Sequence, residues 1–323
     1  MEPLPHTFVC NISFRGRLRL TGKDRVRFLN AQATNDVKNL PAGSGCYAAF
    51  TNAKGKMRSD AVILNRGDSL IVDLEPGYDV RIATDLEKFI IADDVQLENI
   101  SATWKAYTLI GMEAPKVLTN GHFCSEPPGN SFEMNPLVSA DFLRGFLFRS
   151  RRARCDSFDL WVEQSHDNLL QIRLAEAIKQ TGGAFLDASA LEILRVEAGI
   201  PRFGVDMDDS AFPQEAGIEA IAISYTKGCY VGQEVIARIK SMGHVNRTLV
   251  RLRLPEQAKQ GNPLFLNHKE TGKVGSAVSS PTYGRIGLAI VRREASAPGT
   301  VLTLPNGSAT VVSEFIPVMN ILR

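Results

Sequence analysis

The sequence predicts an α+β protein with more than one domain, and three observations lead to this expectation. The chain has 323 residues, which is more than one ordinary hydrophobic core supports. From residue 15 to about residue 200, strand-like alternation of apolar and polar residues is interrupted by helix-like segments. After residue 247 the pattern consists of short strands and turns, which is typical of a small β-barrel.

The composition excludes several classes of protein. Apolar residues make up 44% and charged residues 22% of the chain, as in an ordinary globular protein. A formal net charge of +2 argues against a direct nucleic-acid binder. The five cysteines are scattered without a C-x-x-C pair, which favours free thiols in a reducing compartment and predicts no metal site.

The ends and apolar runs of the chain predict a cytoplasmic protein. The first six residues, Met-Glu-Pro-Leu-Pro-His, contain neither a basic leader nor an apolar core. Apolar runs such as residues 89–92 are too short to span a bilayer, so no membrane partner is expected.

The first elements are expected to be a strand, a helix and a hairpin. Residues 15–20 alternate as a strand, and Thr21 is expected to cap the following helix, with Asp24 in its first turn. Residues 47–64 read as strand, glycine turn and strand, which predicts a β-hairpin. Asp60 stands at the start of its second strand, where a carboxylate is either a turn residue or a ligand contact.

Further strands and a helix follow the hairpin. Residues 69–74, 95–100 and 104–110 alternate as strands, and residues 78–89 follow a helical pattern. Residues 120–135 are expected to form a boundary loop. The basic run at residues 149–154 is interpreted as a solvated strand end, because no aromatic residues are interleaved with it.

The next predicted helix carries an acid among apolar residues. Ser189 and Glu192 have the spacing of a capping box, and Gly199 is expected to end the helix. Glu197 falls inside the apolar arc of this helix, where an unpaired carboxylate is costly. Its partner is either an arginine, such as Arg195 or Arg202, or a ligand.

The most distinctive stretch, residues 225–247, places a thiol among cations. Cys229 lies between two glycines, and the nearby basic residues are Lys227, Arg238, Lys240 and Arg247. Neighbouring cations favour the thiolate, so this pattern predicts a reactive cysteine at a pocket rim. The alternative is an inert, buried cysteine in a glycine turn.

This stretch carries a family resemblance. Residues 227–234 read Lys-Gly-Cys-Tyr-Val-Gly-Gln-Glu and are followed by Arg238. They resemble the motif of the YgfZ family, folate-binding proteins related to the aminomethyltransferase (T-protein) of the glycine cleavage system. The resemblance extends from about Arg15 to the C-terminus.

The resemblance implies a three-domain T-protein-like architecture around a central folate pocket. The expected domains are a discontinuous folate-binding domain of residues 1–48 plus 136–244, a ferredoxin-like domain of residues 49–135, and a C-terminal β-barrel of residues 245–323.

It also implies roles for individual residues. Residues 194–199 resemble L-R-L-E-A-G, in which the acid, here Glu197, holds the pterin ring. Asp60 matches the second acid of the T-protein hairpin, whereas Ser59 replaces the first. The remaining residues expected to contact folate are Tyr230, Gln233, Glu234 and Arg238, with Lys240 or Arg247 as further partners for the glutamate tail. Residues 151–162 depart from the family, because the Gly-Tyr-Thr-Gly-Glu element that contacts substrate is absent.

The function implied is a monomeric protein that binds tetrahydrofolate, or a one-carbon derivative, and acts in the assembly or repair of iron–sulfur proteins. Its partners would be iron–sulfur proteins or assembly factors, including tRNA-modifying enzymes under oxidative stress. Cys229, Lys227 and Asp60 would carry the chemistry, with the thiol as a one-carbon acceptor, a redox group or a transient iron ligand. The alternatives are a folate-dependent aminomethyltransferase or demethylase, and a scaffold without turnover.

Overall fold

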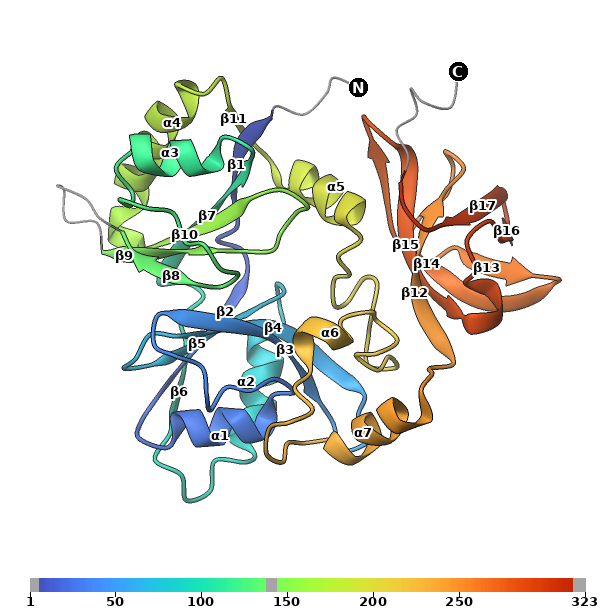
Figure 1. Ribbon diagram of the computed structural model, residues 1–323, viewed down its shortest axis with the longest axis horizontal. Coiled ribbons are helices and arrows are strands. Elements are labelled where there is room, and N and C mark those ends of the chain that lie inside the picture. Colours follow the sequence, from blue (N-terminus) through green and yellow to red (C-terminus); the bar gives the residue numbers. More distant parts are fainter. Residues whose placement is uncertain (1–5, 138–143, 316–323) are drawn as a thin grey trace.

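The computed structural model describes residues 6–137 and 144–315, and shows two open sheets and one closed barrel (Figure 1). The expected α+β fold class with a C-terminal barrel is confirmed. No helix within the described ranges is long and apolar enough to cross a membrane.

The first sheet has six strands in the order β11-β1-β7-β10-β9-β8. These strands are β1 (Thr7–Asn11), β7 (Trp104–Gly111), β8 (Met134–Pro136), β9 (Gly145–Arg149), β10 (Ser157–Glu163) and β11 (Ala184–Leu186). Helices α3 (Ala114–Asn120) and α4 (Asp167–Lys179), the latter preceded by a short 3-10 turn (Gln164–His166), pack on the sheet (Figure 1). Their apolar side chains bury Phe158 and Leu160 completely.

The second sheet has five antiparallel strands in the order β3-β4-β5-β2-β6. They are β2 (Gly16–Thr21), β3 (Ser44–Thr51), β4 (Met57–Asn65), β5 (Leu70–Leu74) and β6 (Gln96–Asn99). Two helices accompany them, α1 (Arg25–Gln32) and α2 (Asp79–Glu87). The order β4-β5-β2-β6 is that of a ferredoxin-like sheet, with β3 added at one edge. The predicted hairpin is confirmed as β3 and β4.

The sheets group the chain differently from the expected domain ranges. Strand β2 and helix α1 lie with β4, β5 and β6, although residues 1–48 were expected in the other unit. Strand β7 lies in the six-stranded sheet, and β3 runs through the expected boundary between residues 48 and 49. The reason is that a local pattern identifies a strand, whereas its partners are chosen by hydrogen bonds to distant segments.

The C-terminal barrel closes in the order β12-β15-β14-β13-β16-β17. Its strands are β12 (Arg247–Arg253), β13 (Pro263–Leu266), β14 (Lys269–Ser280), β15 (Gly284–Arg292), β16 (Val301–Leu304) and β17 (Gly307–Val312), with a 3-10 turn (Arg293–Ala295) after β15. Leu252, Leu264 and Leu302 fill its interior and are fully buried. Closure pairs every strand on both sides and leaves no open edge.

Helix α5 (Ala188–Ala198) contacts strands of both the six-stranded sheet and the barrel (Figure 1). The expected capping box is wrong, because the carboxylate of Asp187 accepts hydrogen bonds from the backbone of Ser189 and Ala190. Gly199 ends the helix in the left-handed conformation, as expected.

Helix α1 likewise begins after Asp24 rather than after Thr21, and Asp24 makes no side-chain cap hydrogen bond. The remaining helices, α6 (Glu219–Ala222) and α7 (Gln233–Met242), flank the loop that carries Cys229.

Candidate functional site

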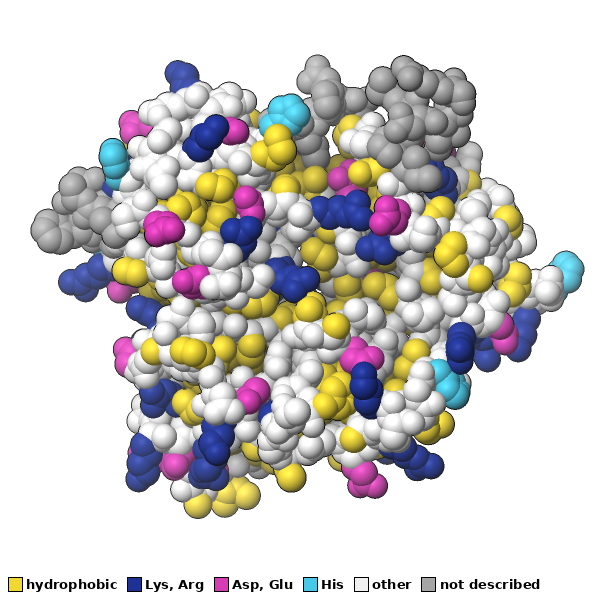
Figure 2. Space-filling model, viewed as in Figure 1, with side chains coloured by type: hydrophobic (Ala, Val, Ile, Leu, Met, Phe, Trp, Pro, Cys, Tyr) yellow, Lys and Arg dark blue, Asp and Glu magenta, His cyan; other side chains and the backbone are white. Residues whose placement is uncertain are grey.

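A central cavity of about 370 Å³ lies between the two open sheets and one face of α5, which lines it along its whole length. Figure 2 shows the molecule hollowed near its centre, with hydrophobic and basic side chains gathered there. Among the described residues, apolar side chains such as Ile12, Phe148 and Leu191 line the cavity. Five arginines and three acids also line it: Arg15, Arg151, Arg152, Arg195, Arg202, Asp60, Glu75 and Glu192.

Among the described residues that line this cavity, Asp60 and Ser150 each have a buried polar side-chain atom without a hydrogen-bond partner, and Asp60 is the ionisable one. Its Oδ2 atom accepts a hydrogen bond of 2.5 Å from the Tyr47 hydroxyl. Its Oδ1 atom is buried and has no hydrogen-bond partner among the described residues. Burial raises the pKa of Asp60 to about 7, and the negative charge of Glu75 adds to this effect. The carboxyl group therefore changes its charge near neutral pH and has one oxygen free for a ligand.

Ser59, which stands where the T-protein hairpin has its first acid, does not line the cavity. Its hydroxyl donates to the backbone carbonyl of Asp60 and is fully buried. Successive side chains of a strand point to opposite faces. An acid at position 59 would therefore face away from Asp60.

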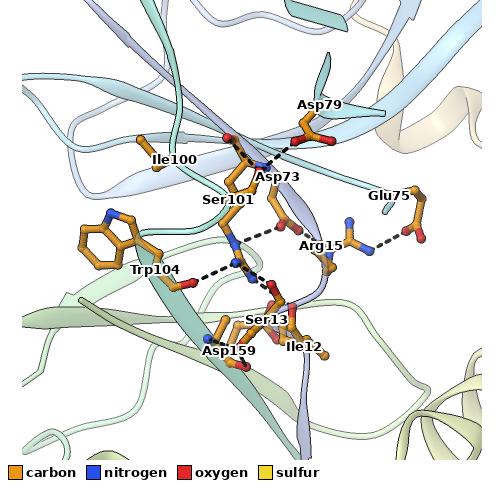
Figure 3. Close-up of polar contacts among 12 residues, drawn as sticks. Ile12, Ser13, Arg15, Asp73, Glu75, Asp79, Ile100, Ser101, Trp104 and Asp159 are labelled. Atoms are coloured by element: carbon orange, nitrogen blue, oxygen red, sulfur yellow. Dashed lines mark hydrogen bonds and ion pairs between the residues drawn. The ribbon is translucent and has the colours of Figure 1, made fainter. Parts of the chain in front are cut away.

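A buried network of charges forms one side of the cavity (Figure 3). The Arg15 guanidinium bonds to Asp73 at 2.8 Å and to Glu75 at 2.5 Å. Arg152 bonds to Asp159 at 2.5 Å and reaches Asp73 at 3.3 Å. Burial opposes ionisation of Asp73, but its arginine neighbours outweigh burial and lower its pKa. The network links the two open sheets, because Asp73 lies on β5 and Asp159 on β10.

Arg152 therefore corrects the interpretation of residues 149–154 as a solvated strand end. Its side chain is only 13% exposed and forms ion pairs with the buried carboxylates of Asp73 and Asp159. Arg151, by contrast, is exposed at the cavity and has no ion pair within the described part of the chain.

On α5 the acid that faces the cavity is Glu192 rather than Glu197. Glu192 pairs with Arg195 at 2.6 Å and with Arg202 at 3.0 Å, so the two arginines considered for Glu197 belong to Glu192. Glu197 accepts a hydrogen bond of 2.5 Å from the hydroxyl of Ser280 on the barrel, and burial raises its pKa. Five residues apart on a helix, the two acids point about 140° away from each other.

Lys227 is buried and hydrogen-bonded to the backbone. Its ammonium group donates to the backbone carbonyls of Asn30, Ala33 and Asn35, at 2.5, 2.6 and 2.8 Å. Burial lowers its pKa to about 8, so it carries its charge at neutral pH. The three bonds anchor the cysteine loop to the segment at the end of α1.

Three of the four cations expected around Cys229 bond to other groups, Lys227 to backbone carbonyls and the other two to acids. Lys240 pairs with Glu219 at 3.1 Å and Arg247 with Glu215 at 2.9 Å. Arg238 is exposed and makes no ion pair with any residue that the structure describes. Cys229 itself is exposed, which excludes the interpretation of a buried, inert cysteine.

The residues after the cysteine line a second cavity, of about 680 Å³, beside the tip of the β3–β4 hairpin. Tyr230, Gln233 and Glu234 contribute to it, whereas Asp60 does not. Gly232 makes the close approach possible, because a Cβ atom there would lie 2.5 Å from the Asn52 carbonyl oxygen. The structure thus divides the expected single site between two cavities and an exposed thiol.

Sequence reasoning missed Tyr47, Arg15, Glu75 and Glu192. The hairpin register contains a signal for Tyr47, because Asp60 pairs with Ala49 and Tyr47 lies on the same face two residues away. No comparable signal marks the other three, which come from different parts of the fold. Among the described residues, no group of three or more His, Cys, Asp or Glu side chains is arranged to hold a metal ion.

Two family models match successive segments of the chain, and the relatives found by sequence agree with them. Residues 6–227 match the GCVT N-terminal domain, and residues 247–314 match the glycine cleavage T-protein C-terminal barrel domain. An aminomethyltransferase from Halalkalibacterium halodurans is 28% identical over 298 residues, which cover 90% of this chain and 80% of that protein. A putative chloroplastic transferase from Arabidopsis thaliana is 25% identical over 317 residues, covering 95% and 70%.

The fold also has a solved counterpart. The crystal structure of the glycine cleavage system aminomethyltransferase T from Bartonella henselae superposes with a TM-score of 0.83. It covers 97% of this chain and 87% of that one, at 21% sequence identity. This likeness shows that the two chains share their architecture.

Proposed function

The chain belongs to the glycine cleavage T-protein family, and on this premise we propose that its central cavity binds tetrahydrofolate or a one-carbon derivative. The family uses tetrahydrofolate as its one-carbon carrier. The observation that carries the proposal is the buried, unpartnered Oδ1 atom of Asp60 in a cavity of about 370 Å³. Ligand pockets of this kind are apolar, with a few polar groups that fix orientation.

The residues that line the cavity fit the two chemically different ends of a folate. Apolar walls such as Phe148 and Leu191 suit a flat heterocycle, and Asp60 offers a carboxyl oxygen to one of its nitrogens. The unpaired, exposed Arg151 suits the anionic glutamate tail. Bound tetrahydrofolate supplies nitrogen atoms that carry the one-carbon unit. The chain's own part is to orient the ring and to hold or release a proton at Asp60.

Folate binding is tested with Asp60→Asn and a stable reduced folate, 5-formyltetrahydrofolate, by isothermal titration calorimetry at about pH 8.5, where the Asp60 carboxylate is ionised and can only accept hydrogen bonds. The Tyr47 hydroxyl will hold the amide oxygen of the new side chain, so its NH2 group will face the ligand and cannot accept a hydrogen bond. We expect a loss of roughly 10- to 100-fold in affinity, the effect of one mispaired buried polar group. Unchanged affinity would exclude Asp60 as the folate contact.

Glu197 is tested in parallel, because the resemblance assigns it to the pterin. Its carboxylate is held by Ser280 and does not line the cavity. We therefore expect Glu197→Gln to weaken folate binding less than Asp60→Asn does. The opposite order would restore Glu197 as the pterin contact.

We further propose that the exposed thiol serves the assembly or repair of iron–sulfur proteins, including tRNA-modifying enzymes under oxidative stress, in the cytoplasm. Cys229 is exposed on a loop that Lys227 anchors, and neither cavity is lined by it. A thiol in this position can contact a partner protein more readily than it can contact a folate bound in the central cavity. All five cysteines are free, which supports a reducing compartment. We propose that the protein acts as a monomer.

Cys229→Ser tests the role of the thiol. We expect folate affinity to stay unchanged, while the activity of iron–sulfur enzymes falls in cells that depend on the variant. If Cys229→Ser complements these cells fully, the thiol is not required and the loop acts as a docking scaffold.

The second candidate function is a folate-dependent aminomethyltransferase, favoured by relatives that bear this name. Formation of 5,10-methylenetetrahydrofolate from an aminomethyl donor, retained in Cys229→Ser, would support it over the iron–sulfur role.

A further inference from the structure

The central cavity contains a second acid beside Asp60 that the sequence motif does not mark. Strands β4 and β5 are antiparallel, and Ala61 pairs with Leu74. Asp60 directly precedes this pair on β4, and Glu75 directly follows it after the end of β5. The negative charge of Glu75 is close enough to Asp60 to raise the pKa of its carboxyl group. Both side chains line the cavity, and Glu75 is only 16% exposed.

Glu75 is fixed in this position by the buried network (Figure 3). Its Oε1 atom accepts a hydrogen bond of 2.5 Å from Arg15. Arg15 is in turn held by the fully buried Asp73, through a bond of 2.8 Å. A free glutamate beside another carboxylate would rotate away into solvent. Here Arg15 holds the Glu75 carboxylate in place, so it stays close to the carboxyl group of Asp60 although the two repel each other when both are ionised.

We propose that Glu75 is the positioning residue of this site, and that its fixed negative charge keeps a proton on Asp60 for use toward a ligand nitrogen. With the proton, the Asp60 carboxyl group donates a hydrogen bond to an unprotonated nitrogen; without it, the carboxylate accepts one from an N–H group. The second acid of the site thus comes from the residue that follows the neighbouring strand β5, instead of from position 59.

The other charged groups around Asp60 do not remove this effect. Tyr47 on β3 donates to Oδ2 and is itself uncharged, because burial raises its pKa well above the usual value. The hydrogen bond from Tyr47 and the charge of Arg15 both lower the pKa of Asp60, but together they do so less than burial and Glu75 raise it, so the result is a value of about 7. The cavity's remaining charges belong to the loop after β9 and to α5 with its following loop: Arg151, Arg152, Glu192, Arg195 and Arg202. Of these, Arg152, Glu192, Arg195 and Arg202 are paired with one another or with Asp159, Asp73 and Asp206.

The direct test measures the titration of Asp60 by 13C NMR of aspartate carboxyl groups, with Asp60→Asn identifying the signal. In the native chain we expect a midpoint near neutral pH. In Glu75→Gln the like charge is gone and Arg15 is released toward Asp60, so the midpoint should fall by about one pH unit or more. Glu75→Asp keeps the charge and should retain most of the elevation. Glu98→Gln, which removes an exposed acid on β6, is the matched control and should leave the midpoint unchanged.

The native titration keeps the proposal falsifiable even if Glu75→Gln fails to fold. A midpoint below about pH 5 in the native chain, or no change in a folded Glu75→Gln, would overturn it. These measurements need no ligand. The consequence for binding, a parallel shift in the pH dependence of 5-formyltetrahydrofolate affinity, rests on the proposed function. If the titration of Asp60 shifts as expected but the pH dependence of 5-formyltetrahydrofolate affinity does not, folate is excluded as the ligand, whereas the role of Glu75 stands.

Discussion

Replacing Asp60 by asparagine should stabilise the ligand-free protein at alkaline pH. Burial raises the pKa of Asp60 to about 7, from a usual value of 3.8. Between these two values the folded chain binds more protons than the unfolded chain, so the free energy of unfolding falls as pH rises. One pH unit of displacement corresponds to about 1.4 kcal/mol. Above pH 7 the ionised carboxylate therefore costs at most about 4 kcal/mol.

Asparagine carries no charge, and its oxygen retains the hydrogen bond from Tyr47. We expect Asp60→Asn to match the native chain at about pH 4 and to exceed its stability by about 2–4 kcal/mol at pH 8. Urea unfolding at several pH values, without folate, measures this difference. Asp68→Asn, on an exposed acid, is the control and should change stability by less than about 0.5 kcal/mol.

The result that would refute the reasoning is a stability difference that does not grow with pH. It would mean that Asp60 ionises in the folded chain as easily as in the unfolded one. An acid retained at a cost to stability is a common property of binding sites, because the ligand later satisfies it.

Three further predictions concern residues outside the cavity's acidic pair. Lys227→Met should lower the free energy of unfolding by about 2–4 kcal/mol, because three carbonyl groups lose their donor. It should leave the alkylation rate of Cys229 by iodoacetamide within about twofold, whereas a tenfold fall would show that Lys227 activates the thiol. Arg152→Met should cost about 3–5 kcal/mol, since it leaves buried carboxylates without their partner, and urea unfolding will show whether the loss is that large. Ser280→Ala should raise the pKa of Glu197 further, because the hydroxyl that stabilises its ionised form is removed; a 13C carboxyl titration with an unchanged midpoint would contradict this.

Elements that are marked by a local sequence pattern, such as alternation or a terminal glycine, could be predicted from the sequence. The hairpin of β3 and β4 follows from alternation around a glycine turn, and the end of α5 follows from Gly199. The barrel follows from regularly spaced short strands. The helix starts were less accessible: Asp187 caps α5 because its carboxylate reaches two backbone N–H groups, although Ser189 and Glu192 have the right spacing.

The grouping of the candidate site residues was decided by tertiary structure. A motif of eight consecutive residues suggests one site, yet Lys227 points into the end of α1, Cys229 is exposed and Tyr230 lines the second cavity. Neighbours in a tightly turning loop point in different directions, so sequence proximity does not make them partners.

The sequence by itself determined the relation to the T-protein family, the β3–β4 hairpin, the barrel and Asp60 as a candidate. Only the tertiary structure brought Glu75 and Asp60 together in one cavity and paired Glu192, instead of Glu197, with the two arginines. The physical reason is that the charge and orientation of a buried group depend on all the elements packed around it. Those elements come from distant parts of the chain, and no local pattern records which of them meet.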